Sequence, residues 1–312
     1  MTPESWWESR IQCTRVRIAA AYTLGMDPLE GAESRVAGAL RHILAKPGSL
    51  VRAVVCYLIG IEMGLEEEAA LAIACGIEYL HTASLVFDDL PSMDDARTRR
   101  GAECTHVVHG EAAAMLAALA LVNRGYALLW RGMRRAGAAT MKEAGEWVDA
   151  RLGTHGLIGG QAHDLKGWHG PQNPADVSAV AARKTADLLR LAMVLPAIVG
   201  RGTRREIRML DRLAILCGVA YQAADDLRDV FSHESVSGKS PGRDSQLGRP
   251  NLVAAVGPAV ALERFHRLRK TADRVHEALP GPPERWGMLH LLRVSIPAPV
   301  CGSQLSIRSA AV

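Results

Sequence analysis

The chain has 312 residues, of which 48% are hydrophobic and 22% charged, and its formal net charge is +4. These values are typical of a soluble globular protein with enough material for a large core. The small charge, without a block of Lys and Arg residues, argues against a nucleic-acid-binding protein.

The ends and the cysteines of the chain point to the cytoplasm. The six cysteines are scattered without a CxxC pair, which is typical of reduced, buried thiols. The first ten residues contain Trp6, Trp7 and several charges, unlike a signal peptide. The longest apolar run, residues 112–122, is too short to cross a bilayer. We therefore expect a cytoplasmic protein without a transmembrane segment.

Helical periodicity dominates the chain. Apolar residues recur at helical spacing over residues 36–44, 66–86 and 110–134, whereas alternating β-branched runs are nearly absent. Helix breakers separate such runs, and they lie at residues 46–48, 170–171, 173–174, 241–242 and 280–283. We predict an all-α fold, a single large helical bundle formed by residues 1–312 as one domain. Residues 303–312 are a candidate disordered tail.

A dense acidic cluster follows the second of these helices. Asp88 and Asp89 come directly after the apolar run, and Asp94 lies six residues beyond Asp88. Pro91 should end or bulge the helix, so that Asp94 returns towards Asp88 and Asp89. Two arginines, Arg99 and Arg100, follow shortly afterwards.

A second acidic cluster ends another apolar helical run, residues 215–224. Asp225 and Asp229 have i, i+4 spacing and share a helix face, with Asp226 beside them. Either cluster alone also fits a solvated surface turn, since surface acids are common. Carboxylates this dense repel one another unless a cation lies between them, and Mg2+ prefers carboxylate and phosphate oxygens. Two such clusters with arginines nearby therefore predict a metal-bridged diphosphate site.

From about residue 40 to about residue 257 the chain resembles the trans-isoprenyl diphosphate synthases, particularly the bacterial and carotenoid-type geranylgeranyl diphosphate synthases. The motifs that carry this resemblance stand in order at residues 78–81, 88–95, 99–101, 160–161, 164–165, 184–185, 222–229, 238–239 and 244. The resemblance implies an isoprenoid synthase fold of the class I terpenoid type with a central cavity. It also implies ionisation of an allylic prenyl diphosphate.

The resemblance further implies a role for each matching residue. About three Mg2+ ions would bind together with the substrate diphosphate, as Lewis acids. The implied metal ligands are Asp88, Asp89, Asp94, Asp225 and Asp229, and Asp226 and Lys184 complete the predicted catalytic set. The implied ligands of the allylic diphosphate are Arg99, Lys184 and Lys239, and Thr185, Gln222 and Gln161 would line the substrate site. Phe87 is a candidate for stabilising a carbocation through its aromatic face.

The chain departs from the family where the second substrate, isopentenyl diphosphate, should bind. The family motif Gly-Gly-Lys-Arg-x-Arg-Pro falls on residues 47–53, where Ser49 and Leu50 replace two basic residues and Arg52 remains. Arg100 and His81, also expected near that diphosphate, are retained. Loss of one direct cation–phosphate contact should cost about 1.5–3 kcal/mol, or roughly ten- to hundredfold in affinity. Residues 248–251, Gly-Arg-Pro-Asn, likewise replace the family's Gly-Lys-Ser/Thr-Thr.

These departures leave three interpretations open. Damage to the second-substrate motif favours a terpene synthase, in which the carbocation cyclises, loses a proton or captures water. The alternative is a prenyltransferase that elongates an allylic diphosphate with isopentenyl diphosphate, and the low aromatic content of 4% supports it. A non-catalytic partner subunit is a third interpretation, but such a subunit would not need both acidic clusters.

Two further expectations concern chain length and assembly. Ala83, five residues before Asp88, is small, so the cavity should accept a farnesyl or geranylgeranyl chain. Small apolar residues over 112–120 fit a subunit interface, and the resemblance implies a homodimer.

Overall fold

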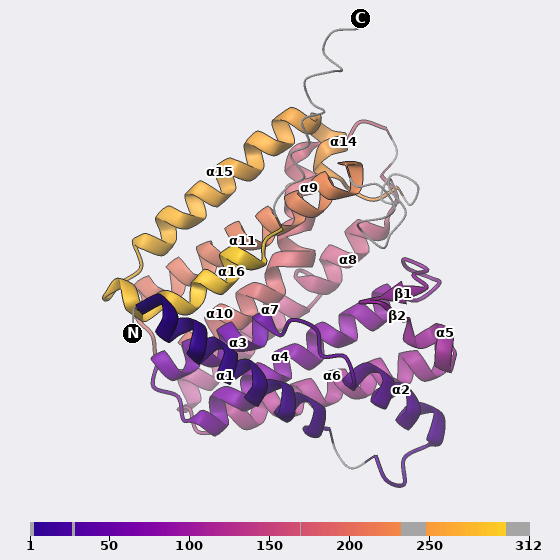
Figure 1. Ribbon diagram of the computed structural model, residues 1–312, viewed down its shortest axis with the longest axis horizontal. Helices are drawn as coiled ribbons and strands as arrows, with labels where there is room; N and C mark the ends of the chain where they lie inside the picture. Colours follow the sequence, from indigo (N-terminus) through magenta and orange to yellow (C-terminus); the bar gives the residue numbers. More distant parts are fainter. Residues whose placement is uncertain (1–2, 27–28, 169, 232–247, 298–312) are drawn as a thin grey trace, which may run out of the picture.

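The computed structural model describes residues 3–26, 29–168, 170–231 and 248–297 of the chain. Within these ranges the protein is a bundle of helices with one short two-stranded ribbon (Figure 1), so the predicted all-α fold is confirmed. The elements in the first half are α1 (Pro3–Leu24), α2 (Ser34–Leu44), α3 (Val51–Glu62), α4 (Glu67–Asp88), β1 (Thr98–Arg99), β2 (Ala102–Glu103), α5 (Thr105–His109), α6 (Glu111–Met133) and α7 (Ala138–Leu152). Those in the second half are α8 (Leu157–Leu165), α9 (Pro174–Ala181), the π-helical turn η1 (Ala182–Ala186), α10 (Asp187–Val199), α11 (Arg204–Phe231), α14 (Leu252–Val256), α15 (Pro258–Glu277), the 3-10 turn η2 (Pro283–Leu289) and α16 (His290–Ser295).

The predicted helices are present with small shifts at their ends. The first begins two residues early, at Ser34, because the Glu33 side chain accepts hydrogen bonds from the Arg35 and Val36 amides and caps the helix. The predicted helices over 66–86 and 110–134 correspond to α4 and α6. The predicted breaker at 241–242 and the candidate tail at 303–312 lie outside the described residues.

Helix α4 runs through the interior and carries the first acidic cluster at its end. It contacts α1, α3, α6 and α10, which explains why it is apolar nearly all round. Both α4 and α6 are long and apolar enough to span a membrane by composition alone. The most apolar part of α4 is 72% buried inside the bundle, whereas that of α6 is 44% buried. The apolar composition of α4 is thus accounted for by packing, and α6 keeps an exposed apolar face.

The N-terminal helix packs beside the last elements of the described chain. Helix α1 contacts the 3-10 turn η2, and its start lies at the left of the molecule in Figure 1. The Trp7 Nε1 donates to the Glu284 carbonyl at 2.7 Å. Gly287 lies so close that a Cβ atom there would be 2.2 Å from the Trp7 ring. This contact closes the end of the bundle that lies away from the acidic clusters.

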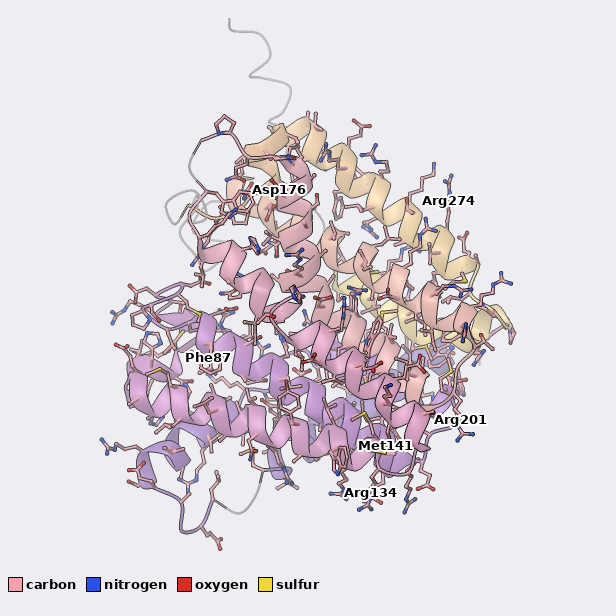
Figure 2. All side chains as sticks on the ribbon, turned by 180° about the vertical axis from the view of Figure 1, so that it is seen from behind. Phe87, Arg134, Met141, Asp176, Arg201 and Arg274 are labelled. Carbon is pink, nitrogen blue, oxygen red and sulfur yellow. The ribbon has the colours of Figure 1, made fainter. Side chains whose placement is uncertain are left out.

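The opposite end collects the loops that carry the predicted site residues. Helices α8, α9 and α14 lie above the ribbon β1–β2 that follows α4 (Figure 1). Seen from behind, Phe87 in the last turn of α4 and Asp176 in the first turn of α9 lie on one side of the molecule (Figure 2). Arg201 and Arg274 lie on the other side. The loops that carry the predicted site residues thus lie on one side of the molecule, away from Arg201 and Arg274.

Candidate active site

The first acidic cluster folds back on itself as Pro91 predicts. Helix α4 ends at Asp88, and the Asp94 amide donates to the Asp88 carbonyl at 2.9 Å. Burial raises the pKa of the Asp88 carboxyl to about 6, and the nearby Asp94 adds to this effect while Lys184 opposes it. Two carboxylates at close quarters, one of them reluctant to ionise, form an oxygen-rich site suited to a hard cation.

The neighbouring Asp89 has a different environment. Its side chain is buried, and both carboxylate oxygens accept from the Arg99 Nε, at 2.7 and 2.8 Å. Arg99 lies in β1, and the turn to β2 passes through Arg100 and Gly101, both with positive φ. The residue predicted to bind metal and the residue predicted to bind diphosphate are therefore paired with each other. Asp89 fixes the orientation of Arg99, and its assignment as a metal ligand stays a prediction.

The second acidic cluster also combines one buried, hydrogen-bonded carboxylate with two that are more accessible. Asp226 is 1% exposed and accepts from the Gln222 Nε2 at 2.9 Å and from the Leu252 amide at 2.7 Å. Asp225 is half-buried and accepts from the Arg228 Nη2 at 2.7 Å, and Asp229 is also half-buried. Asp226 thus holds the start of α14 against α11, whereas Asp225 and Asp229 are more accessible.

The wide turn η1 presents two consecutive site residues to two different helices. The Lys184 Nζ donates to the Asp164 Oδ2 in α8 at 2.6 Å, and the Thr185 Oγ1 donates to the Gln222 Oε1 in α11 at 2.9 Å. Burial acts against the charge of Lys184, but Asp164 and Asp88 outweigh it and raise its pKa above the usual value. Lys184 is therefore a cation held beside the first acidic cluster, as expected of a diphosphate ligand.

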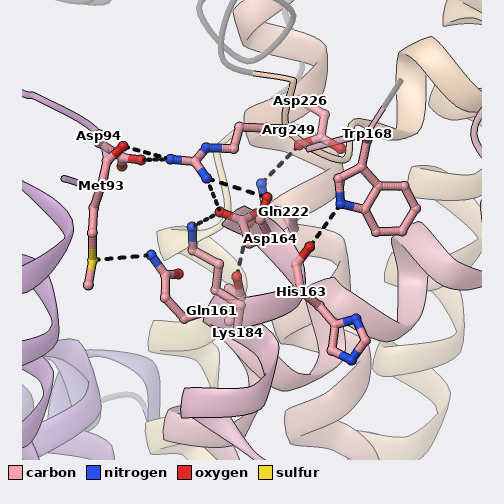
Figure 3. Close-up of polar contacts among 11 residues, drawn as sticks. Met93, Asp94, Gln161, His163, Asp164, Trp168, Lys184, Gln222, Asp226 and Arg249 are labelled. Carbon is pink, nitrogen blue, oxygen red and sulfur yellow. Dashed lines mark hydrogen bonds and ion pairs between the residues drawn. The ribbon is translucent and has the colours of Figure 1, made fainter. Parts of the chain in front are cut away.

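Arg249, to which the sequence motifs assigned no role, lies between the two clusters (Figure 3). The Arg249 Nη2 donates to the Asp94 Oδ1 at 2.7 Å, and Nη1 lies 3.8 Å from the Asp164 Oδ2. Three residues later, the Leu252 amide binds Asp226. The segment at residues 249–252 therefore contacts both acidic clusters and brings them into one site.

The donor set suits magnesium best when a substrate diphosphate is also bound. Among the described residues, no three His, Cys, Asp or Glu side chains lie close enough to hold a metal ion by themselves. Mg2+ usually takes one or two carboxylates and completes its shell with water and phosphate oxygens. Asp88 and Asp94 supply such carboxylates, and Lys184 and Arg99 supply cations for a phosphate. The site therefore matches a metal–diphosphate complex, and the depth of the expected cavity beneath it stays a prediction.

A second polar group, predicted to bind the second substrate, surrounds the loop between α2 and α3. Arg100 lies directly over Gly48, where a Cβ atom would be 2.3 Å from the guanidinium, and it donates to the Lys46 carbonyl at 3.3 Å. The Arg52 Nη1 lies 3.2 Å from the His81 Nε2. Burial, together with Arg52, lowers the pKa of His81 well below its usual value, so a neutral imidazole accepts this hydrogen bond. Arg52, His81 and Arg100 thus come from separate segments of the chain and lie close together near the loop between α2 and α3.

Beneath this group lies Glu78, which the motif contained but to which we gave no role. Glu78 is 2% exposed, and burial raises its pKa to about 7 while Arg52 and Arg100 act in the opposite direction. The Glu78 Oε2, the Arg52 Nε and the His81 Nδ1 are buried without a hydrogen-bond partner among the residues that the structure describes. Unsatisfied polar atoms of this kind are rare in native proteins, and a binding site is one explanation for them.

The remaining predicted residues have few polar contacts with the first acidic cluster or lie outside the described part of the chain. Ala83 is 1% exposed within α4, and Phe87 is half-buried against the core. The Gln161 Nε2 lies 3.8 Å from the Met93 sulfur, beside the first cluster (Figure 3). Lys239 lies outside the described residues.

Comparison with known proteins gives one consistent result. The family model described as polyprenyl synthetase matches residues 33–276. Geranylgeranyl pyrophosphate synthase 4 of Arabidopsis thaliana is 33% identical over 239 residues, which is 75% of this chain and 63% of that protein. Chloroplastic geranylgeranyl pyrophosphate synthase 7 of the same plant is 37% identical over 221 residues, 69% of this chain and 63% of that protein. The chain thus spans less than two thirds of the length of these relatives.

Solved structures show the same fold. A geranyltransferase from Helicobacter pylori, complexed with magnesium and isoprenyl diphosphate, has a TM-score of 0.80 at 24% identity, covering 94% of this chain and 97% of that one. An FPP/GFPP synthase from Zymomonas mobilis has a TM-score of 0.79 at 21% identity, covering 94% of this chain and all of that one (100%). At these identities the likeness concerns the fold alone.

Proposed function

The chain belongs to the polyprenyl synthetase family, and on this premise we propose that it is a prenyltransferase that joins an allylic prenyl diphosphate to isopentenyl diphosphate. The observation that carries the proposal is the convergence of Arg52, His81 and Arg100 beside the acidic site. The names of the relatives, geranylgeranyl pyrophosphate synthases, favour this alternative over the terpene synthase that the sequence motifs favoured.

The acidic end of the bundle would hold the allylic diphosphate. Asp88, Asp94, Asp225 and Asp229 are the carboxylates that would bind Mg2+, which when bound draws charge off the diphosphate oxygens. Lys184 would donate to the departing diphosphate, where negative charge accumulates as the carbon–oxygen bond breaks. Asp89 would act indirectly, because it fixes Arg99 through two hydrogen bonds.

The cationic group would hold the second diphosphate. Arg52 and Arg100 would bind its oxygens, and the neutral His81 keeps Arg52 in place. The alkene of isopentenyl diphosphate would then supply the electron pair of the new carbon–carbon bond. The adjacent carbon would lose a proton, which the released diphosphate can accept. Separate side chains would anchor the two diphosphates, so the two reacting carbons would be held close together.

A terpene synthase remains the second candidate, and one observation favours it. Leu50, where the family has a basic residue, is 2% exposed and has a left-handed φ of 55°. Its side chain is part of the core and cannot contact a phosphate, and Ser49 beside it carries no charge. The second-substrate site therefore has fewer cations than the family motif provides.

One incubation separates the two candidates. Purified protein is given Mg2+ and farnesyl diphosphate, with and without isopentenyl diphosphate, and the products are identified by mass spectrometry. A longer prenyl diphosphate that forms only with isopentenyl diphosphate supports our proposal, whereas hydrocarbons or alcohols released without it support a terpene synthase. Asp88→Ala should abolish either product. Asp176→Ala, which removes an exposed acid in α9, should not.

We also propose that the protein forms a homodimer through α6. A row of its apolar side chains is exposed, namely Met115 (40%), Leu119 (54%), Tyr126 (47%) and Trp130 (63%). Their spacing places them along one side of the helix, and exposed apolar surfaces of this kind mark protein interfaces. Light scattering of Leu119→Glu should give the mass of a monomer if a second copy covers this row.

A further inference from the structure

Arg249 is a buried cation that the proposed reaction does not yet use. Its side chain is 8% exposed, and it comes from the loop before α14 yet reaches the loop after α4. One nitrogen, Nη2, donates to the Asp94 Oδ1 at 2.7 Å and to the Met93 carbonyl at 2.9 Å. The other, Nη1, donates to the Asp164 carbonyl at 3.4 Å (Figure 3). One side chain thus joins the first acidic cluster to α8.

The backbone around Arg249 is held from both sides. The Gly248 carbonyl accepts from the Trp168 amide at 2.8 Å, and the Arg249 carbonyl accepts from the Gln172 Nε2 at 3.1 Å. The Gln172 Oε1 in turn accepts from the Asn251 amide at 2.9 Å. The base of the side chain is therefore fixed to the loop between α8 and α9, so the position of the guanidinium is determined by the fold.

The contacts of Arg249 coincide with those that a metal and a diphosphate would need. Asp94 is one of the two carboxylates of the first acidic cluster that are proposed to bind Mg2+, and Arg249 lies within hydrogen-bond distance of it. Asp164 is shared by Arg249 and Lys184, the proposed diphosphate ligand. A divalent cation arriving at Asp94 would meet a positive charge already in place, and like charges at this distance repel.

We propose that Arg249 is a positioning residue that forms ion pairs with Asp94 and Asp164 before substrate arrives. Its ion pair with Asp94 breaks when a divalent cation and a diphosphate bind. In the substrate-free protein it holds the loop after α4 against α8, so that the acidic cluster keeps its shape. Its charge also weakens the binding of a metal ion that arrives alone. The inference rests on the proposed function, because it assumes that Asp94 is a metal ligand.

Metal binding without turnover tests this proposal. Mn2+, which replaces Mg2+ and is detected by electron paramagnetic resonance, is titrated into the wild-type protein and Arg249→Met in the absence of diphosphate. We expect Arg249→Met to bind Mn2+ roughly ten- to hundredfold more tightly, the effect of removing one charge-assisted contact to the same carboxylate. Equal or weaker binding by this variant would overturn the proposal. Arg249→Lys keeps the charge with fewer donors, so its affinity should lie between the two.

Thermal unfolding distinguishes the proposed positioning role of Arg249 from a purely structural role. In EDTA, Arg249→Met should unfold at a lower temperature than the wild type, and Mg2+ with inorganic pyrophosphate should remove most of this difference. The matched control is Arg285→Met, which breaks a partly buried pair with Glu206 away from the site. The decrease in unfolding temperature of Arg285→Met should be the same in EDTA and in Mg2+ with pyrophosphate. A loss for Arg249→Met that is equally insensitive to Mg2+ and pyrophosphate would show a structural role and overturn the proposal.

A third variant separates this inference from the function on which it rests. Asp94→Asn should lose Mn2+ binding if Asp94 is a metal ligand. Wild-type binding in Asp94→Asn would overturn both the metal assignment and the role of Arg249. Lost binding in Asp94→Asn together with unchanged binding in Arg249→Met would overturn the role of Arg249 alone.

Discussion

Returning the missing cation to the second-substrate site should strengthen binding of isopentenyl diphosphate. Ser49 is exposed and adjoins Gly48, over which the Arg100 guanidinium lies. A charge-assisted hydrogen bond to phosphate contributes about 1.5–3 kcal/mol. At an exposed position solvent screening reduces such a contribution to about 1 kcal/mol, which is roughly a fivefold change in affinity. We therefore expect Ser49→Lys to lower the KM for isopentenyl diphosphate about fivefold and to leave kcat nearly unchanged.

The assay is the incorporation of labelled isopentenyl diphosphate into prenyl product at saturating allylic diphosphate. Ala139→Lys, an exposed site in α7, adds the same charge far from the loop and serves as the control. Leu50→Arg is not equivalent, since Leu50 is buried with a left-handed backbone, and this change should destabilise the fold. An unchanged KM in Ser49→Lys, or an equal decrease in Ala139→Lys, would refute our assignment of this loop to the second diphosphate.

Three other variants test separate parts of the site. Folding raises the pKa of Glu78 from 4.5 to about 7, so this residue favours the folded state most below pH 4.5 and progressively less up to pH 7. The free energy of unfolding of the wild type should therefore fall between about pH 5 and about pH 8, and in Glu78→Gln this fall should be smaller by up to about 3 kcal/mol. Urea titrations at several pH values measure it, and the same pH dependence in both proteins would contradict this reasoning. Ala83→Tyr should shorten the longest prenyl chain found by mass spectrometry, whereas an identical product distribution would count against a channel beside Ala83. Asp226→Ala leaves the buried Leu252 amide unpaired and should cost about 1–3 kcal/mol of stability in EDTA, more than Asp225→Ala at its half-buried site, and equal losses would argue against this anchoring role.

Local sequence rules predicted the helices and the shape of the first cluster. Helical periodicity located α4 and α6, because their apolar residues must face several neighbours. Pro91 predicted the end of α4 and the return of Asp94, because proline cannot continue the hydrogen bonding of a helix. Asn251 followed by an apolar run is a capping signal that would also have located α14, where Asn251 accepts from the Val253 and Ala254 amides.

The pairing of charges within the site could not be predicted in this way. Arg249 and Asp94 are 155 residues apart, and no local pattern connects them. Asp89 looked equivalent to Asp88 in the sequence, yet the turn between β1 and β2 directs Arg99 onto Asp89. Which carboxylate faces a ligand and which holds a neighbour depends on tertiary packing, because the helix directions decide which side chains meet.

The π-helical turn η1 has a consequence for reading related chains. Residues 174–199 form helix on both sides of it, and such a turn contains about one residue more than an α-helical turn. Removal of that residue would rotate one half against the other by roughly 100°. A homologue with a one-residue gap here would keep both helical halves yet aim another side chain at Asp164. The helical segments before and after residues 182–186 should therefore be aligned separately when the residue that corresponds to Lys184 is identified in a homologue.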